Sequence, residues 1–315
     1  MMNNRTGMLI GIAGALVIGG VFFIQDIGED AIPVDTRAAT VHASAVCALE
    51  NSASVVLEAR SAFVLNLNSG ETLFEKEGFQ QMPLASLTKL MTVLTAADVL
   101  EKNGAIIISK EALVPEGDSG LFVGEKWNMQ DLIDFTLMTS SNDGAHALAL
   151  VALNNASPAE HSFVALMNRR AADIGLYQTY FLNDTGLDIS TTTGGAYGSA
   201  RDVATLVSYA YRNAQPIFSA STEKEKTFIS LSGFAHRAKN TSALNGTLSG
   251  EIIAKTGFTD LAGGNLAIIA EPILGMPVAI VVLNSSRNGR DNDVRLLYAY
   301  AKKTLKHSLL CKGVL

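Results

Sequence analysis

Short apolar runs typical of β-strands stand near both ends of this chain, and the stretch between them is mostly helical. The strand-like runs occupy residues 62–67, 71–76, 251–258, 265–270 and 277–283. Helical spacing predicts helices over residues 86–101, 129–138, 143–153, 157–175, 199–212 and 291–303, with a Ser157–Glu160 capping box beginning the fourth. Strands from two ends of a domain bury their apolar faces economically in one shared sheet. We therefore expect an α/β (α+β) fold, with an antiparallel five-stranded sheet flanked by helices and an inserted all-helical lobe.

An uncharged apolar run, Met8 to Ile24, precedes the folded part. It has close to the number of apolar residues that a membrane-spanning helix needs, with Arg5 before it and acidic residues after it. We expect a cytoplasmic segment, a transmembrane signal anchor, a linker, a folded domain and a C-terminal tail at residues 1–7, 8–25, 26–45, 46–306 and 307–315. The folded domain would then be extracytoplasmic and attached to the cell membrane by a single span. Cleavage of the apolar run as a signal, which would secrete the domain, is the alternative.

Composition excludes some classes of function. The formal net charge of −6 gives no electrostatic case for binding nucleic acid. The five histidines show no metal-ligand spacing, so we expect no metal and no cofactor. Cys47 and Cys311 are expected to be two unpaired buried thiols, and a disulfide between them is the alternative if the chain is exported.

The first of three motifs that could carry chemistry is Ser86-Leu87-Thr88-Lys89. Residues i and i+3 of a helix share a face, so the Lys89 amine can reach the Ser86 hydroxyl and act as its base. This requires a lowered lysine pKa, which burial and a second cation, Lys255, would supply. The Ser86 backbone N–H is a candidate oxyanion donor. A second S-x-x-K, Ser221 to Lys224, lies among charged residues and is interpreted as a solvated lysine after a capping serine.

The second motif, Ser140-Ser141-Asn142, falls between two predicted helices. A loop there can aim a hydroxyl and an amide into a cleft. Ser140 would pass a proton between Lys89 and a leaving amine, and Asn142 would orient Lys89 and hold a substrate peptide group. Ordinary helix capping by Ser141 or Asp143 explains the local sequence about as well.

The third motif, Lys255-Thr256-Gly257, lies on a predicted strand. Lys255 and Thr256 can bind a terminal carboxylate by charge and hydrogen bond, and Gly257 permits close approach of a ligand. The Phe258 N–H is a candidate second oxyanion donor. A bulge glycine beside a surface lysine is the alternative for this motif taken alone.

The three motifs and their flanks resemble those of the serine D-alanyl-D-alanine carboxypeptidases, the low-molecular-mass penicillin-binding proteins. The resemblance covers about Val46 to Leu305, and Ser141 stands where that family usually has Gly. It implies a β-lactamase/transpeptidase-like fold, removal of the terminal D-Ala from peptidoglycan stem peptides through an acyl-enzyme on Ser86, and covalent inhibition by β-lactams. It also implies an arginine that binds the substrate carboxylate. Arg290 is the best-placed candidate, with Arg237 and Lys239 as competitors.

Several other functions remain as alternatives. A DD-endopeptidase would use the same centre, and a catalytically silent β-lactam or cell-wall sensor would keep the same fold. A serine β-lactamase of class A adds a glutamate in an E-x-x-x-N loop. Candidate carboxylates between the second and third motifs include Glu160, Asp173, Asp184 and Asp188, and none of these has Asn four residues on. Residues 117–120 read like the nucleophile segment of a trypsin-like protease, but only His42 precedes them.

Overall fold

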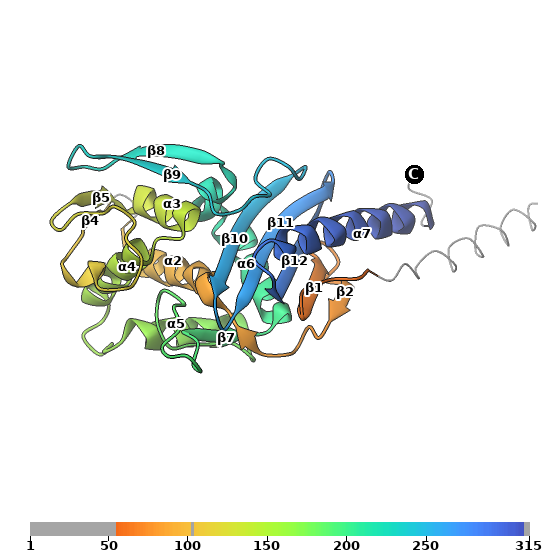
Figure 1. The fold of residues 1–315 in the computed structure, drawn as a ribbon, viewed down its shortest axis with the longest axis horizontal. Coiled ribbons are helices and arrows are strands. Elements are labelled where there is room, and N and C mark those ends of the chain that lie inside the picture. Colours follow the sequence, from red (N-terminus) through yellow and green to blue (C-terminus); the bar gives the residue numbers. More distant parts are fainter. Residues whose placement is uncertain (1–54, 102–103, 312–315) are drawn as a thin grey trace, which may run out of the picture. The chain divides into compact units, whose positions relative to one another are not determined.

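The five strands expected at the two ends of the domain form one antiparallel sheet in the order β10-β11-β12-β1-β2 (Figure 1). The computed structural model describes residues 55–101 and 104–311. The strands of this sheet are β1 (Ser61–Asn66), β2 (Thr72–Lys76), β10 (Glu251–Thr259), β11 (Gly263–Ile273) and β12 (Met276–Ser285). Val64 of β1 lies opposite Ile280 of β12, so the first strand of the described sequence pairs with the last one. The expected fold class and sheet are confirmed.

Alternate residues of the central strands face two separate cores. Val281 packs in the core shared with the helical lobe, whereas its neighbour Val282 packs in the core beneath α7 (Gly289–Cys311). Val294 belongs to the α7 side, and α6 (Ala200–Asn213) covers the opposite face of the sheet. Each fully buried aliphatic side chain contributes about 1.5–3 kcal/mol, so this alternation fixes the strand register.

The inserted lobe contains most of the helices, and short strands fringe it. The remaining α-helices are α2 (Thr88–Val99), α3 (Met129–Thr139), α4 (Asn142–Asn155) and α5 (Phe163–Ile174). The 3-10 helices are η1 (Ala85–Leu87), η2 (Glu111–Leu113) and η3 (Gln215–Thr222). The short strands are β3 (Met82–Pro83), β4 (Ala105–Ile107), β5 (Lys126–Asn128), β6 (Tyr180–Phe181), β7 (Ala196–Gly198), β8 (Glu225–Ile229) and β9 (Ala235–Lys239).

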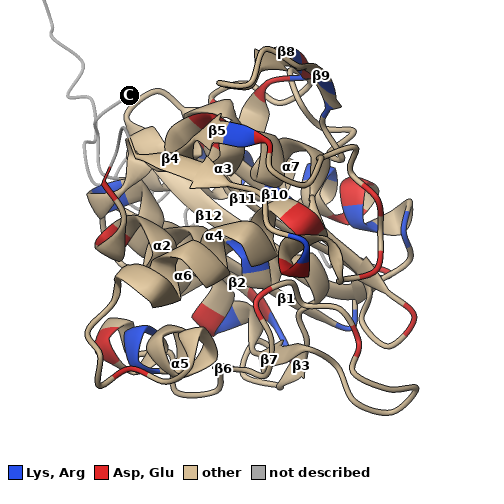
Figure 2. Ribbon diagram, turned by 90° about the vertical axis from the view of Figure 1, so that its left-hand side faces the viewer, with Lys and Arg blue, Asp and Glu red and all other residues tan. Residues whose placement is uncertain are grey.

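Charged residues on this lobe are mixed in sign. Figure 2 views the molecule from the lobe end, and basic and acidic residues are interspersed over the helices in that view. Arg169 pairs with Glu160, and Arg170 with Asp98. Exposed pairs of this kind contribute at most about 1 kcal/mol each, so they shape a solvated surface rather than drive the fold.

The β8–β9 hairpin was not predicted. Its outer face is charged and exposed, which resembles a loop in sequence, but Phe228 and His236 on its inner face are buried. The His236 Nε2 lies 2.6 Å from Glu125 Oε1, and the His236 ring lies 4.8 Å from that of Trp127. Contacts with residues more than a hundred positions earlier therefore make this segment a hairpin.

Two helix ends differ from expectation by more than two residues. α5 begins at Phe163 and is capped by Ser162, whose Oγ accepts from the Ala165 N–H, so the expected start at Ser157 is wrong. Glu160 does not close a capping box, because its carboxylate is paired with Arg169. α7 continues beyond its expected end, to Cys311.

The predicted membrane span, Met8 to Ile24, lies outside the described residues. Within residues 55–101 and 104–311, no helix combines the length and the apolar character needed to cross a membrane. Cys311 is exposed and disulfide-bonded, which contradicts the expectation of two unpaired buried thiols. Cys47 lies outside the described residues.

We predict that Gly186→Ala lowers the free energy of unfolding by about 3 kcal/mol, because positive φ and steric overlap both oppose a side chain there. Gly186 has φ +80°, and an added Cβ would lie 1.9 Å from the Ala85 carbonyl oxygen. Gly70→Ala is the matched control, with φ +74° and open space around the added carbon, and should cost about 1 kcal/mol. Urea unfolding of both variants measures the difference. Equal losses would contradict the close packing of residue 186 on Ala85.

Candidate active site

The first motif lies where η1 passes into α2. Ser86 lies in the 3-10 turn η1, not in the α-helix expected from its spacing, and Lys89 lies in the first turn of α2. The Lys89 Nζ is 3.0 Å from the Ser86 Oγ and donates a hydrogen bond to it. The i, i+3 geometry expected from the sequence therefore holds through the junction of the two helices.

Lys89 is fully buried and held by acceptors from three segments. Besides Ser86, its Nζ donates to Asn142 Oδ1 and to the Thr185 carbonyl oxygen, each at 2.7 Å. Burial lowers the pKa of Lys89 from 10.5 to about 7, and the nearby charge of Asp184 opposes this shift. A large fraction of the amine is therefore neutral near pH 7.

Burial and the charge of Lys255 were expected to lower the pKa of Lys89; burial is the main cause, and the charges of Lys89 and Lys255 repel each other. Burial lowers the pKa of Lys89, whereas the pKa of Lys255 is lowered well below 10.5 by burial and then by the charges of Lys89 and Arg290. Repulsion between two charges acts on both of them, so burial of Lys89 and Lys255 in one site disfavours simultaneous protonation of the two lysines.

The second motif combines a cap with a group that faces the site. Ser141 caps α4 by accepting from the Gly144 N–H at 2.9 Å, while Ser140 ends α3 with φ +61°. A left-handed conformation costs a non-glycine residue about 1–2 kcal/mol. In this conformation the Ser140 Oγ accepts from Lys255 Nζ at 3.0 Å. Asn142 is the first residue of α4, not a loop residue, and its Nδ2 donates to the Glu116 carbonyl at 2.6 Å.

The third motif lies on β10, an edge strand of the sheet, and runs beside η1. A Cβ on Gly257 would lie 2.9 Å from the Leu84 carbonyl oxygen, so the absence of a side chain lets the strand backbone approach the nucleophile turn. The Thr256 Oγ1 lies 2.6 Å from that of Thr241. This contact attaches the loop before β10 to the motif.

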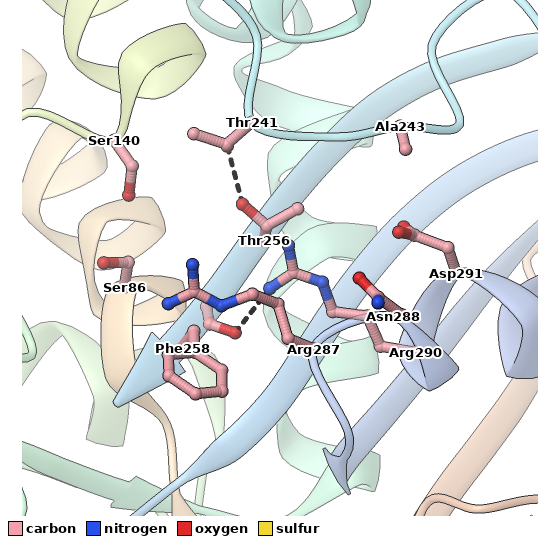
Figure 3. A pocket seen from close by; sticks show the side chains of 11 residues that line it. Ser86, Ser140, Thr241, Ala243, Thr256, Phe258, Arg287, Asn288, Arg290 and Asp291 are labelled. Atoms are coloured by element: carbon pink, nitrogen blue, oxygen red, sulfur yellow. Dashed lines mark hydrogen bonds between the residues drawn. The ribbon is translucent and has the colours of Figure 1, made fainter. Parts of the chain in front are cut away.

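A pocket of about 410 Å³ opens over these groups. It is lined by Ser86, Ser140, Thr241, Ala243, Thr256, Gly257, Phe258, Arg287, Asn288, Arg290 and Asp291 (Figure 3). Arg290 is buried, and its Nη1 donates to the Gly257 carbonyl at 2.8 Å. Arg287 lies over the Phe258 ring, with 4.0 Å between the guanidinium carbon and the ring centroid. Serine and threonine hydroxyl groups and two guanidinium groups thus line one cavity.

The family model for D-alanyl-D-alanine carboxypeptidases matches residues 48–287, more than half of the chain. The chain belongs to this family.

Curated relatives of the family differ in length and in name. A D-alanyl-D-alanine endopeptidase of Pseudomonas aeruginosa is 31% identical over 238 residues, which covers 73% of this chain and 72% of that protein. A D-alanyl-D-alanine carboxypeptidase of Bacillus subtilis is 33% identical over 156 residues, which covers 47% of this chain but only 38% of that protein.

Solved structures of the family share the fold. A D-alanyl-D-alanine carboxypeptidase of Mycobacterium tuberculosis superposes with a TM-score of 0.69 at 25% identity, covering 79% of this chain and 94% of that one. A penicillin-binding protein of Listeria monocytogenes in its ampicillin-bound form superposes with a TM-score of 0.67 at 26% identity, covering 79% and 99%. The expected β-lactamase/transpeptidase-like fold is confirmed.

The other residues considered as nucleophiles or as carboxylate-binding groups lie away from the pocket or interact with other groups. The buried Ser221 Oγ accepts from the Ala254 N–H at 3.2 Å, so this decoy serine helps hold β10. Arg237 on β9 is exposed and pairs with Glu225, and Lys239 on the same strand does not line the pocket. The Ser119 N–H of the trypsin-like segment donates to Asp143 Oδ2.

Three residues that contact the predicted groups of the site were not predicted from the sequence. The Thr185 carbonyl holds Lys89, Thr241 contacts Thr256, and Arg287 stacks on Phe258. No local pattern marks a backbone carbonyl or a loop threonine as functional, although Arg287 is only three residues from the predicted Arg290. Among the described residues, no group of three or more His, Cys, Asp or Glu side chains could hold a metal.

Proposed function

We propose that this protein is a serine D-Ala-D-Ala carboxypeptidase that removes the terminal D-Ala from peptidoglycan stem pentapeptides. The observation that carries the proposal is the buried Lys89 amine, 3.0 Å from the Ser86 hydroxyl and with a pKa of about 7, in a site shared with Lys255 and Arg290. A neutral amine beside a serine is a competent base, and the buried cations favour a substrate that ends in a carboxylate.

Acylation begins with transfer of the Ser86 hydroxyl proton to Lys89. The Ser86 oxygen then forms a bond to the carbonyl carbon of the penultimate D-Ala, and negative charge develops on the carbonyl oxygen. The Ser86 and Phe258 N–H groups are assigned as the donors to this oxyanion. The position of Ser86 beside the edge strand β10 supports the assignment.

Collapse of the tetrahedral intermediate breaks the bond to the terminal D-Ala. The departing amine needs a proton, which the Ser140 hydroxyl would deliver while it takes up the proton that Lys89 removed from Ser86, so that Lys89 is neutral again. Ser140 lies in the pocket and accepts a hydrogen bond from Lys255. Water then attacks the acyl-enzyme ester, Lys89 accepts the water proton, and Ser86 regains its hydrogen. Asn142 holds Lys89 in place during both steps.

The substrate carboxylate is assigned to Thr256, Lys255 and Arg290. Arg290 is buried in the pocket, and burial lowers its pKa, so an anion there would relieve an unfavourable buried charge. Arg287 is exposed at the same pocket and is the competitor. An extended substrate would pair along β10.

β-Lactams are expected to acylate Ser86 and to be released slowly. The ampicillin-bound relative supports recognition of this ligand class. Among the described residues that line the pocket, Asp291 is the only acidic one, so no glutamate stands there to activate a deacylating water as in class A β-lactamases.

We also propose that residues 8–25 anchor the enzyme to the cell membrane, with the catalytic domain outside, where peptidoglycan is found. The proposal rests on the uncharged run Met8 to Ile24 and the acidic residues after it. The mass of the mature amino terminus in a membrane fraction tests it. A soluble product that begins after residue 25 would indicate a cleaved signal instead.

For the reaction itself, we predict that the protein releases D-Ala from diacetyl-Lys-D-Ala-D-Ala and forms a long-lived penicillin adduct on Ser86. Ser86→Ala should abolish both, and Lys89→Ala should slow acylation by about 10²–10⁴-fold. D-Ala release and intact mass spectrometry measure the two steps. Rapid penicillin turnover would favour a β-lactamase, cleavage only of cross-linked peptides an endopeptidase, and reversible binding without either reaction a sensor.

For the carboxylate, we predict that Arg290→Ala lowers kcat/KM for the D-Ala-D-Ala peptide by roughly 10–100-fold, the loss of one charge-assisted hydrogen bond. Arg287→Ala should have a smaller effect because that side chain is exposed. The matched substrate is the same peptide with its terminal carboxylate amidated, on which the wild type and the Arg290 variant should differ little. An equal loss on both substrates would mean that Arg290 only supports the Gly257 carbonyl.

A further inference from the structure

A histidine–aspartate pair lies close enough to the proposed base for its carboxylate to act on the charge of Lys89. His146 is four residues after Asn142 on α4, and its Nδ1 lies 2.8 Å from Asp184 Oδ2. Asp184 is 8% exposed. No step of the proposed reaction uses either residue, yet a buried carboxylate needs a partner and His146 supplies it.

The same segment holds the base through its backbone. The Asp184 carbonyl accepts from the Thr92 hydroxyl at 2.6 Å, and the next carbonyl, that of Thr185, accepts from Lys89 Nζ at 2.7 Å. Both donors lie on α2, three residues apart. The His146–Asp184 contact therefore ties this acceptor segment to α4, which itself contributes Asn142 to Lys89.

We propose that His146 and Asp184 form a positioning pair for Lys89, which fixes the carbonyl that binds the amine and sets the electric field on it through the charge state of His146. The proposal rests on the assignment of Lys89 as the base. Neither residue touches the reacting atoms, so both act through Lys89.

The charges of His146 and Asp184 act on the pKa of Lys89 in opposite directions. The negative charge of Asp184 raises the pKa of Lys89, against the larger effect of burial. The hydrogen bond to Asp184 raises the pKa of His146 above 6.5, although its partial burial opposes this. The charged group from a neighbouring element that interacts with the pair is Lys89 of α2. Asp143, three residues before His146 on α4, accepts a hydrogen bond from the Ser119 N–H. Protonated His146 offsets the charge of Asp184 and so favours the neutral, reactive form of Lys89.

The test is the pH dependence of acylation by a fluorescent penicillin, measured on the full chain. The wild-type rate should rise with pH through a midpoint near 7, where Lys89 loses its proton. Asp184→Asn keeps the shape but removes the negative charge, and should move the midpoint about one pH unit lower. His146→Gln keeps a hydrogen-bond donor but cannot carry a charge, and should move the midpoint higher.

Asp98→Asn is the matched control, because it removes a carboxylate near the end of α2 that pairs with Arg170 away from the pocket. Its midpoint should equal that of the wild type. Opposite shifts in the two test variants support the proposal, whereas lower rates with unmoved midpoints, or shifts in one direction, overturn it. Thermal unfolding of each variant identifies any loss of folded protein, and the midpoint is then read from the folded fraction.

The outcome is separable from that of the proposed function. If Lys89→Ala still acylates at the wild-type rate, the assignment of the base is wrong and the proposal fails with it. If Lys89→Ala is inactive but the two midpoints do not move, only the role of the His146–Asp184 pair is wrong.

Discussion

The burial of Lys89 is the constraint on which the rest of the site depends. An ammonium group removed from water is costly unless acceptors surround it or it gives up its proton. Here both occur, because three acceptors meet the Nζ while burial brings its pKa to about 7. A lysine in this state can exchange a proton with a serine near neutral pH, which a solvated lysine cannot do.

The fold buries Lys89 by packing segments that are distant in the sequence around its amine. The acceptors of Lys89 lie on η1, on α4 and in the segment before β7, and the edge strand β10 closes the site from the side of the sheet. Gly257 and Gly186 allow the close approaches, since a side chain at either position would meet the backbone around the nucleophile turn. Packing of the two cores on either side of the sheet holds these segments in register.

The site gathers more positive charge than it neutralises by itself. Lys89, Lys255 and Arg290 are all buried, and the charges of the other two lower the pKa of Lys255. A substrate carboxylate would relieve this repulsion, so binding of an anion and retention of charge on Lys255 favour one another. The electrostatics of the site thus favour a ligand that carries negative charge near the scissile bond.

The sequence alone determined the sheet, most helices and the residues of the three motifs, because strand and helix periodicity and the i, i+3 spacing of Ser86 and Lys89 are local properties. It did not reveal the β8–β9 hairpin, whose inner face is defined by Glu125 and Trp127, or the Thr185 carbonyl and the Thr241 hydroxyl. It indicated that burial would lower the pKa of Lys89 but not by how much, since desolvation depends on how completely the folded chain excludes water. Only the tertiary structure decided these features, because each arises from contacts between residues far apart in the chain.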